Sequence, residues 1–177
     1  MSAPFDPRLL MRFGAGPEDA AARLEQELEA FTALLPLLKP HWTARPAADA
    51  WCPAQVVEHV IKVNDATSKI LHLLNRQAPL PEVARRPGEL ANGKPQAPIQ
   101  LKPGEPRPFA ELTAAWQVST ARFLAEVAST RDWTERRFFH PFFGDLSAQA
   151  WVQAMSFHNA HHRKGLERAF LGTASDA

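Results

Sequence analysis

Three histidines have the residue type and the spacing of a metal site. His158 and His162 lie four residues apart, so in a helix their imidazoles lie one above the other and can bind the same cation. His59 lies in a second apolar segment and would add a third nitrogen from a facing helix. Three nitrogen ligands with one coordination position left open are typical of a catalytic metal rather than a structural one.

The neighbouring residues refine this prediction. A lone inward histidine is more often a hydrogen-bonded core residue, but two stacked ones are harder to explain because burying imidazoles without partners costs free energy. His161 competes with His162 for the pair with His158, but its helical row continues through Lys164 and Arg168, which suit solvent. We therefore favour His162. Gly165 is expected to leave open space beside the pair, and His140 is expected to pack or to form hydrogen bonds.

Four helices are predicted to position these histidines, because apolar residues recur every three or four positions. They span residues 17–38, 53–77, about 108–127 and 147–172. Ser147 is a suitable N-cap for the last helix and Gly172 a suitable stop. The inward stripe of that helix is predicted to comprise Trp151, Met155, His158, His162, Leu166 and Ala169. Both histidines of the pair are thereby expected to point into the core.

The connections between the helices predict how the helices are arranged. Residues 78–107 contain seven prolines and are expected to form an irregular crossover without helix or strand. A connection of this length lets the second and third helices run parallel. The aromatic segment 132–146 is expected to cap one end. The predicted fold class is all-α, a four-helix bundle in a single domain over residues 1–177, with its core at about 17–172.

Composition excludes several classes of protein. With 20 basic and 19 acidic residues, the formal charge is +1 and no basic patch indicates nucleic-acid binding. No apolar stretch is long enough to span a membrane, and the N-terminus lacks the features of a signal peptide. The single cysteine suits a reducing compartment, so a cytoplasmic protein is expected.

Two common metal motifs are absent. The His158–His162 segment lacks the glutamate of the His-Glu-x-x-His protease motif, and no Glu-x-x-His pair is present for a ferritin-like di-iron centre. The remaining prediction is one divalent metal, zinc or nickel, held by neutral nitrogens. Its full charge would lower the pKa of a bound water or thiol.

The chain resembles the DinB/YfiT-like superfamily of metalloenzymes. The resemblance rests on Trp-Cys-Pro-Ala-Gln-Val-Val-Glu-His-Val at 51–60, on His-Asn-Ala-His-His-Arg at 158–163, and on His-Pro-Phe-Phe-Gly at 140–144, which is similar to a His-Pro-x-x-Gly lead into the last helix. The match extends from Pro17 to Gly172. It implies an up-down-down-up four-helix bundle with a long second crossover, and zinc or nickel at His59, His158 and His162.

The resemblance also suggests an activity, since characterised members of the superfamily include thiol S-transferases that use bacillithiol or glutathione and mycothiol-dependent isomerases. The first hypothesis is therefore an enzyme that activates a low-molecular-weight thiol for attack on an electrophilic substrate. Arg163 is a candidate for binding a cofactor carboxylate, although a solvated helix surface explains it equally well. A metal-hydroxide hydrolase is the variant with water in place of the thiol. No carboxylate is expected on the inner stripes, and the absence of a general base favours the thiol.

A second hypothesis is a metal-stabilised binding protein without catalytic activity, possessing a closed site. A fourth ligand or an aromatic plug from Phe138, Phe139, Phe142 and Phe143 would close it. Apolar rows on the first helix would suit a homodimer. Cys52 stands where the superfamily usually has serine. A helix N-terminus favours a thiolate, but the simpler interpretation is a small residue in a serine's capping position.

Overall fold

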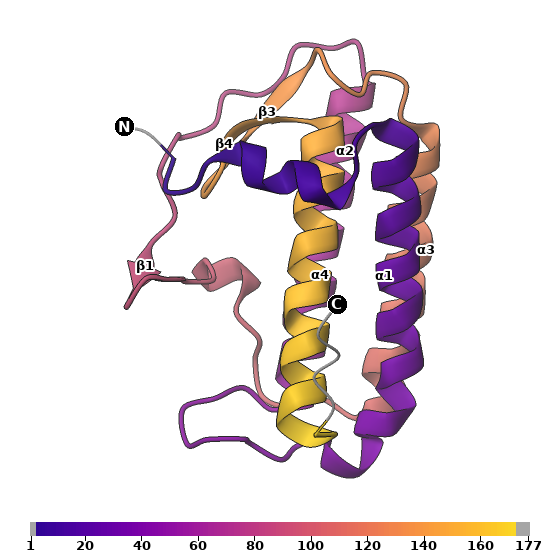
Figure 1. The fold of residues 1–177 in the computed structure, drawn as a ribbon, viewed down its shortest axis with the longest axis vertical. Helices are drawn as coiled ribbons and strands as arrows, with labels where there is room; N and C mark the ends of the chain where they lie inside the picture. Colours follow the sequence, from indigo (N-terminus) through magenta and orange to yellow (C-terminus); the bar gives the residue numbers. More distant parts are fainter. Residues whose placement is uncertain (1–2, 173–177) are drawn as a thin grey trace.

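The computed structural model describes residues 3–172, and four long helices form its body (Figure 1). They are α1 (Pro17–Leu38), α2 (Pro53–Asn75), α3 (Phe109–Ser129) and α4 (Ala148–Phe170). The predicted helices match these bounds to within a few residues at every end. The all-α four-helix bundle is thus confirmed.

The helix directions follow from the two kinds of connection. In Figure 1, α1 and α4 run downward while α2 and α3 run upward, which is the up-down-down-up arrangement. The long crossover returns the chain from the end of α2 to the end at which α2 began, so α2 and α3 are parallel neighbours. α1 packs along α4, and α4 also contacts α2. This last contact brings the two histidine-bearing helices together.

The core contains the apolar stripes expected from the sequence. Leu24, Leu28 and Phe31 of α1 and Trp116 and Phe123 of α3 are almost completely buried. The ring centroids of Phe31 and Trp116 lie 4.6 Å apart in a stacked arrangement. One member of the α4 stripe departs from the prediction. Ala169 is exposed and lines an open pocket, although the next residues, Phe170 and Leu171, pack against the core.

The helix ends have the caps that their sequences predict. The Ser147 hydroxyl accepts the Ala150 N–H (3.3 Å), and Gly172 adopts a positive φ of 67° just beyond α4. Cys52 is buried at the N-cap of α2, and its N–H donates to the Gln55 side chain (3.3 Å). The position of Cys52 agrees with its interpretation as a small capping residue.

The crossover contains more structure than expected. A short antiparallel hairpin pairs β1 (Leu90–Ala91) with β2 (Lys94–Pro95), and a single 3-10 turn, η3 (Ile99–Leu101), follows. The expectation of no helix or strand was therefore wrong. Asn92 and Gly93 both have positive φ, of 52° and 74°, as a tight hairpin turn requires.

The aromatic segment forms a second hairpin at one end of the bundle. β3 (Arg137–His140) pairs antiparallel with β4 (Gly144–Ser147), which leads directly into α4. An N-terminal 3-10 helix, η1 (Pro7–Phe13), packs on α4, and the short η2 (Lys39–His41) continues α1. Phe5 contacts the rings of Phe142 and Phe143, so the N-terminal segment is joined to the hairpin.

Within residues 3–172, no helix combines the length and the apolar character needed to cross a bilayer.

Candidate metal centre

The three histidines predicted from the sequence converge on one point between α2 and α4. Each of His59, His158 and His162 has a ring nitrogen that lies within 4.8 Å of a ring nitrogen of the other two. The Nε2 atoms of His59 and His158 are 3.2 Å apart. The ring centroids of His158 and His162, one turn apart on α4, are separated by 4.5 Å. The fold thus brings His59 beside two histidines that follow it by 99 and 103 positions in the sequence.

This cluster fits a small divalent cation. Two nitrogens that share a tetrahedral zinc ion at about 2.05 Å lie about 3.3 Å from each other. The 3.2 Å between His59 and His158 agrees with this spacing. Such ions are commonly bound by His, Cys, Asp and Glu side chains. In the described part of the chain, no fourth residue of these types belongs to the cluster. The donor set therefore has the character of a three-histidine site with room for an exogenous ligand.

Burial keeps the three imidazoles neutral. Loss of solvent lowers the pKa of His162 to about 3 and lowers the pKa of His158 well below its ordinary value. Burial likewise lowers the pKa of His59, although a hydrogen bond to the Leu101 carbonyl acts in the opposite direction. A metal ligand must be unprotonated. These three rings therefore offer free nitrogens at neutral pH, before any cation arrives.

A backbone carbonyl of the crossover sets the orientation of His59. Nδ1 of His59 lies 2.8 Å from the Leu101 carbonyl oxygen, which only accepts, so Nδ1 carries the proton. Nε2 is then the unprotonated nitrogen, and it faces His158. Such an outer hydrogen bond fixes both the tautomer and the ring plane of a ligating histidine. Trp51 packs against the same imidazole, with ring centroids 5.0 Å apart.

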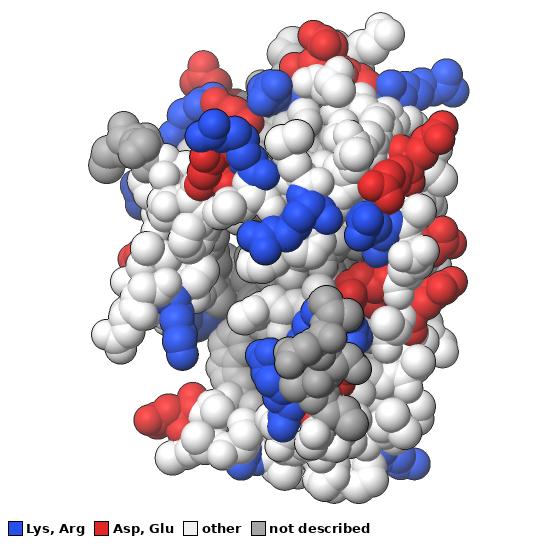
Figure 2. Space-filling view, in the orientation of Figure 1, with Lys and Arg blue, Asp and Glu red and all other residues white. Residues whose placement is uncertain are grey.

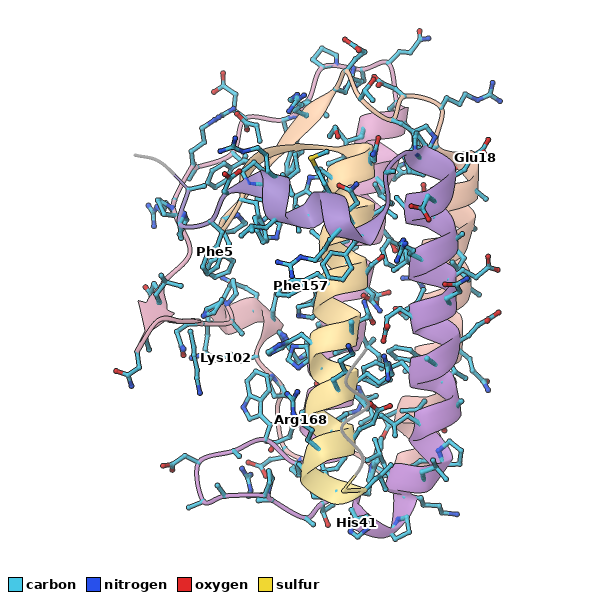
Figure 3. All side chains as sticks on the ribbon, in the orientation of Figure 1. Phe5, Glu18, His41, Lys102, Phe157 and Arg168 are labelled. Atoms are coloured by element: carbon cyan, nitrogen blue, oxygen red, sulfur yellow. The ribbon has the colours of Figure 1, made fainter. Side chains whose placement is uncertain are left out.

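One face of α2 fastens the crossover over the site. Gln55 donates to the Gly104 carbonyl (2.9 Å), and Glu58 accepts the Gly104 N–H (3.1 Å). Lys62 donates to the Lys102 carbonyl (2.8 Å). These side chains, with His59, recur at the three- and four-residue spacing of one helix face. Figure 3 shows Lys102 on this crossover, beside the lower half of α4.

Glu58 is a buried carboxylate that the sequence analysis did not anticipate. Its side chain is in contact with Lys62 at 2.9 Å as well as with Gly104, and its residue is only 8% exposed. The expectation that no carboxylate lies inward was therefore wrong. The i, i+4 spacing of Glu58 and Lys62 indicates an ion pair, but the burial of Glu58 comes from the crossover that covers it. Glu58 anchors the crossover and is not one of the clustered metal donors.

The family assignment follows from comparison with known proteins. Residues 18–165 match the DinB superfamily. The chain belongs to this superfamily. It is 27% identical over 143 residues to the uncharacterized protein YuaE of Bacillus subtilis (strain 168), covering 78% of this chain and 88% of that protein. It also resembles the crystal structure of TT2238, a four-helix bundle protein, with a TM-score of 0.64 and 30% identity over 86% of this chain and 99% of that one.

Four histidines of this DinB-superfamily chain lie outside the cluster, and two of them, His140 and His161, belong to segments that lead into or carry the histidine pair. His161 is exposed, as its row on α4 predicted. His140 packs on Trp151, with ring centroids 4.8 Å apart, and its Nδ1 accepts the Phe142 N–H at 3.0 Å. Burial lowers the pKa of His140 to about 4. His140 thus has the packing and hydrogen-bonding role that was expected from its place in the aromatic segment.

Arg163 faces α1 instead of the histidines. Its guanidinium forms ion pairs with Glu27 of α1 and, at 2.7 Å, with Glu167 of α4. The Arg163 and Glu27 side chains are each 15% exposed. These hydrogen-bonded carboxylates raise the pKa of Arg163. The role of Arg163 in binding a cofactor carboxylate stays a prediction. Such binding would require the cofactor carboxylate to replace Glu27 or Glu167 as a partner of Arg163.

A pocket of about 140 Å³ adjoins the cluster on the side of His162. Gly165 forms part of its wall, and a Cβ added there would meet no atom within 4 Å. The open space predicted beside the histidine pair is therefore present. Figure 2 shows that this face of the molecule is hollowed between the crossover and α4, and that charges of both signs are distributed over it.

Proposed function

We propose that this DinB-superfamily chain is a metal-dependent thiol S-transferase. In this proposal His59, His158 and His162 hold one zinc or nickel ion, and the substrates are a low-molecular-weight thiol and an electrophile. The observation that carries it is the convergence of three neutral, largely buried imidazoles within 4.8 Å. A cytoplasmic location, where such thiols are kept reduced, belongs to the same proposal.

The residues around the cluster have distinct tasks under this proposal. The Leu101 carbonyl holds the His59 ring with Nε2 toward the site, and Trp51 shields one side of that imidazole from water. The bound ion would supply Lewis acidity, which lowers the pKa of a coordinated thiol. The pocket at His162 would admit the reaction partner to the cluster.

The choice between thiol and water rests on proton transfer. Attack by water usually needs a general base, whereas a thiol needs only to ionise. Glu58, the buried carboxylate on α2, is already bonded to Lys62 and to the Gly104 N–H. Within the described residues no Asp or Glu belongs to the donor cluster. These facts favour a thiol over a hydrolytic water, and the accessible pocket favours an enzyme over a closed binding protein.

Turnover by metal-loaded protein tests the proposal. Zinc- or nickel-loaded protein should accelerate the reaction of glutathione or bacillithiol with 1-chloro-2,4-dinitrobenzene above the uncatalysed rate. His158→Ala/His162→Ala should abolish the acceleration, and His72→Ala, a control at an exposed histidine of α2 outside the cluster and the pocket, should retain it. Metal-loaded protein that accelerates the reaction of neither thiol would favour the non-enzymatic binding protein.

A further inference from the structure

The pocket beside His162 has mostly apolar walls that come from two separate parts of the chain. One side is the segment that leads into and begins α2, and the other side is the last three turns of α4. Its apolar lining consists of Pro46, Trp51, Val56, Leu166, Ala169 and Phe170. Trp51 also contacts the His59 ring, so the inner end of the pocket lies at the donor cluster.

The size of the pocket limits what can enter it. A dry apolar cavity of about 150 Å³ holds one benzene molecule. Sites that enclose larger organic ligands occupy about 300–1,000 Å³. The 140 Å³ available here is therefore sufficient for a single ring. Most of a larger ligand, such as a tripeptide thiol, would extend beyond the pocket through its open side.

Arg168 is the charged residue among the described lining residues of the pocket. His161 and His162 complete its polar lining as neutral imidazoles, and none of these lining residues is acidic. Arg168 lies on the lower half of α4 (Figure 3), and within residues 3–172 it forms no ion pair with a carboxylate. The other arginine in the second half of α4, Arg163, is paired with two. A guanidinium that has no carboxylate partner among residues 3–172 and lies at an apolar pocket favours an anion over a neutral or cationic group.

We infer that this pocket binds a small aromatic carboxylate, with its ring on the apolar walls and its carboxylate at Arg168. This inference rests on the proposed function in one respect: it assigns the pocket to the electrophilic substrate and leaves the thiol outside. The substrate class is then a single-ring aromatic acid. Binding itself depends only on the walls and on Arg168, and it does not require a metal.

Benzoate and benzamide are matched probes for this inference, because they share a ring and differ in charge. Binding to metal-free protein is followed by NMR, through the Trp51 indole N–H and the Gly165 amide. We expect benzoate to bind at least about tenfold more tightly than benzamide, in line with one charge-assisted hydrogen bond. Arg168→Gln should reduce benzoate affinity to that of benzamide and leave benzamide unchanged. Arg86→Gln, in the exposed crossover, is the control.

A second variant tests the location of the ligand. Gly165→Leu should fill the pocket and abolish binding of both probes, and it should fold, since a helical glycine is replaced where a Cβ meets nothing within 4 Å. Equal affinities for the two probes, or benzoate binding that survives Gly165→Leu, would overturn the inference. The binding test uses metal-free protein, so it is independent of transferase activity. Equal affinities for benzoate and benzamide in a protein that has transferase activity would reject only the assignment of the pocket to an aromatic carboxylate. Tighter binding of benzoate by a protein that binds no metal would reject only the proposed function.

Discussion

Asn64 of α2 and Asn159 of α4 exchange two hydrogen bonds between their side-chain amides, of 3.0 and 3.3 Å. Both side chains are fully buried. Asn159 directly follows His158, and Asn64 lies five residues after His59. A reciprocal amide pair is satisfied in only one alignment of the two helices. It therefore fixes the register in which His59 meets His158.

The amide pair should contribute measurably to stability. Asn159→Leu leaves the Asn64 amide buried without its partner, which should cost about 1–3 kcal/mol in the free energy of unfolding. Asn64→Leu should cost a similar amount, and the double variant less than the sum, because it removes both polar groups. Urea unfolding of metal-free protein measures these differences. Gln77→Leu, at an exposed position after α2, is the control. Additive losses would show that the two amides act independently.

Glu58 should influence metal affinity through the crossover that it anchors. Glu58→Ala releases the Gly104 N–H and the Lys62 ammonium, which should loosen the segment that carries the Leu101 carbonyl. Loss of such outer support typically weakens a metal site by 10–100-fold, and we expect about tenfold here. Competition with a chromogenic zinc chelator measures the affinity.

Two further variants separate this role from a general effect of charge. Glu58→Gln keeps an acceptor for the Gly104 N–H and should restore most of the affinity. Glu82→Ala removes an exposed carboxylate from the same crossover and should change nothing. Unchanged zinc affinity in Glu58→Ala would contradict the anchoring role.

His140 should make the protein less stable in acid. Its pKa is about 4 in the folded state and near 6.5 when unfolded. The unfolded chain therefore binds more protons between these values, and the free energy of unfolding falls as the pH decreases from 6.5 to 4. The contribution of this residue is at most about 3 kcal/mol. His140→Asn should remove it, so the stability difference between variant and parent should shrink as the pH falls. A difference that stays constant between pH 6.5 and 4 would refute this.

Arg163 should act chiefly in stability. Arg163→Met leaves Glu27 and Glu167 without their cation, which should cost about 2–3 kcal/mol, somewhat less than for a completely buried pair. Zinc content and glutathione affinity should not change. Urea unfolding, atomic absorption and a glutathione titration provide the three readouts. A fall in glutathione affinity without a loss of stability would instead support the assignment of Arg163 to a cofactor carboxylate.

Much of the site could be predicted because it depends on local periodicity. Trp151 and Met155 each lie seven residues before a histidine of the pair, so the helical repeat alone placed His158 and His162 on the inward face. Ser147 and Gly172 marked the ends of α4 for the same local reasons. The Pro-rich crossover correctly indicated that α2 and α3 run parallel.

The remaining features depend on tertiary contacts that periodicity does not encode. The Leu101 carbonyl meets His59 across 42 residues of sequence, and a backbone group has no residue-type signature. The inward position of Glu58 depends on the Gly104 N–H that covers it. The turn at Asn92 and Gly93 did have a local signal, but it was masked by the surrounding prolines.

Metal content tests the central claim most directly. Elemental analysis should find about one zinc or nickel ion per chain in protein purified without chelators. His158→Ala/His162→Ala should contain none, and His161→Ala, which alters only the exposed neighbour, should retain the full amount. Folded parent protein that contains no metal and binds no added zinc or nickel would contradict the three-histidine metal centre and the chemistry proposed for it.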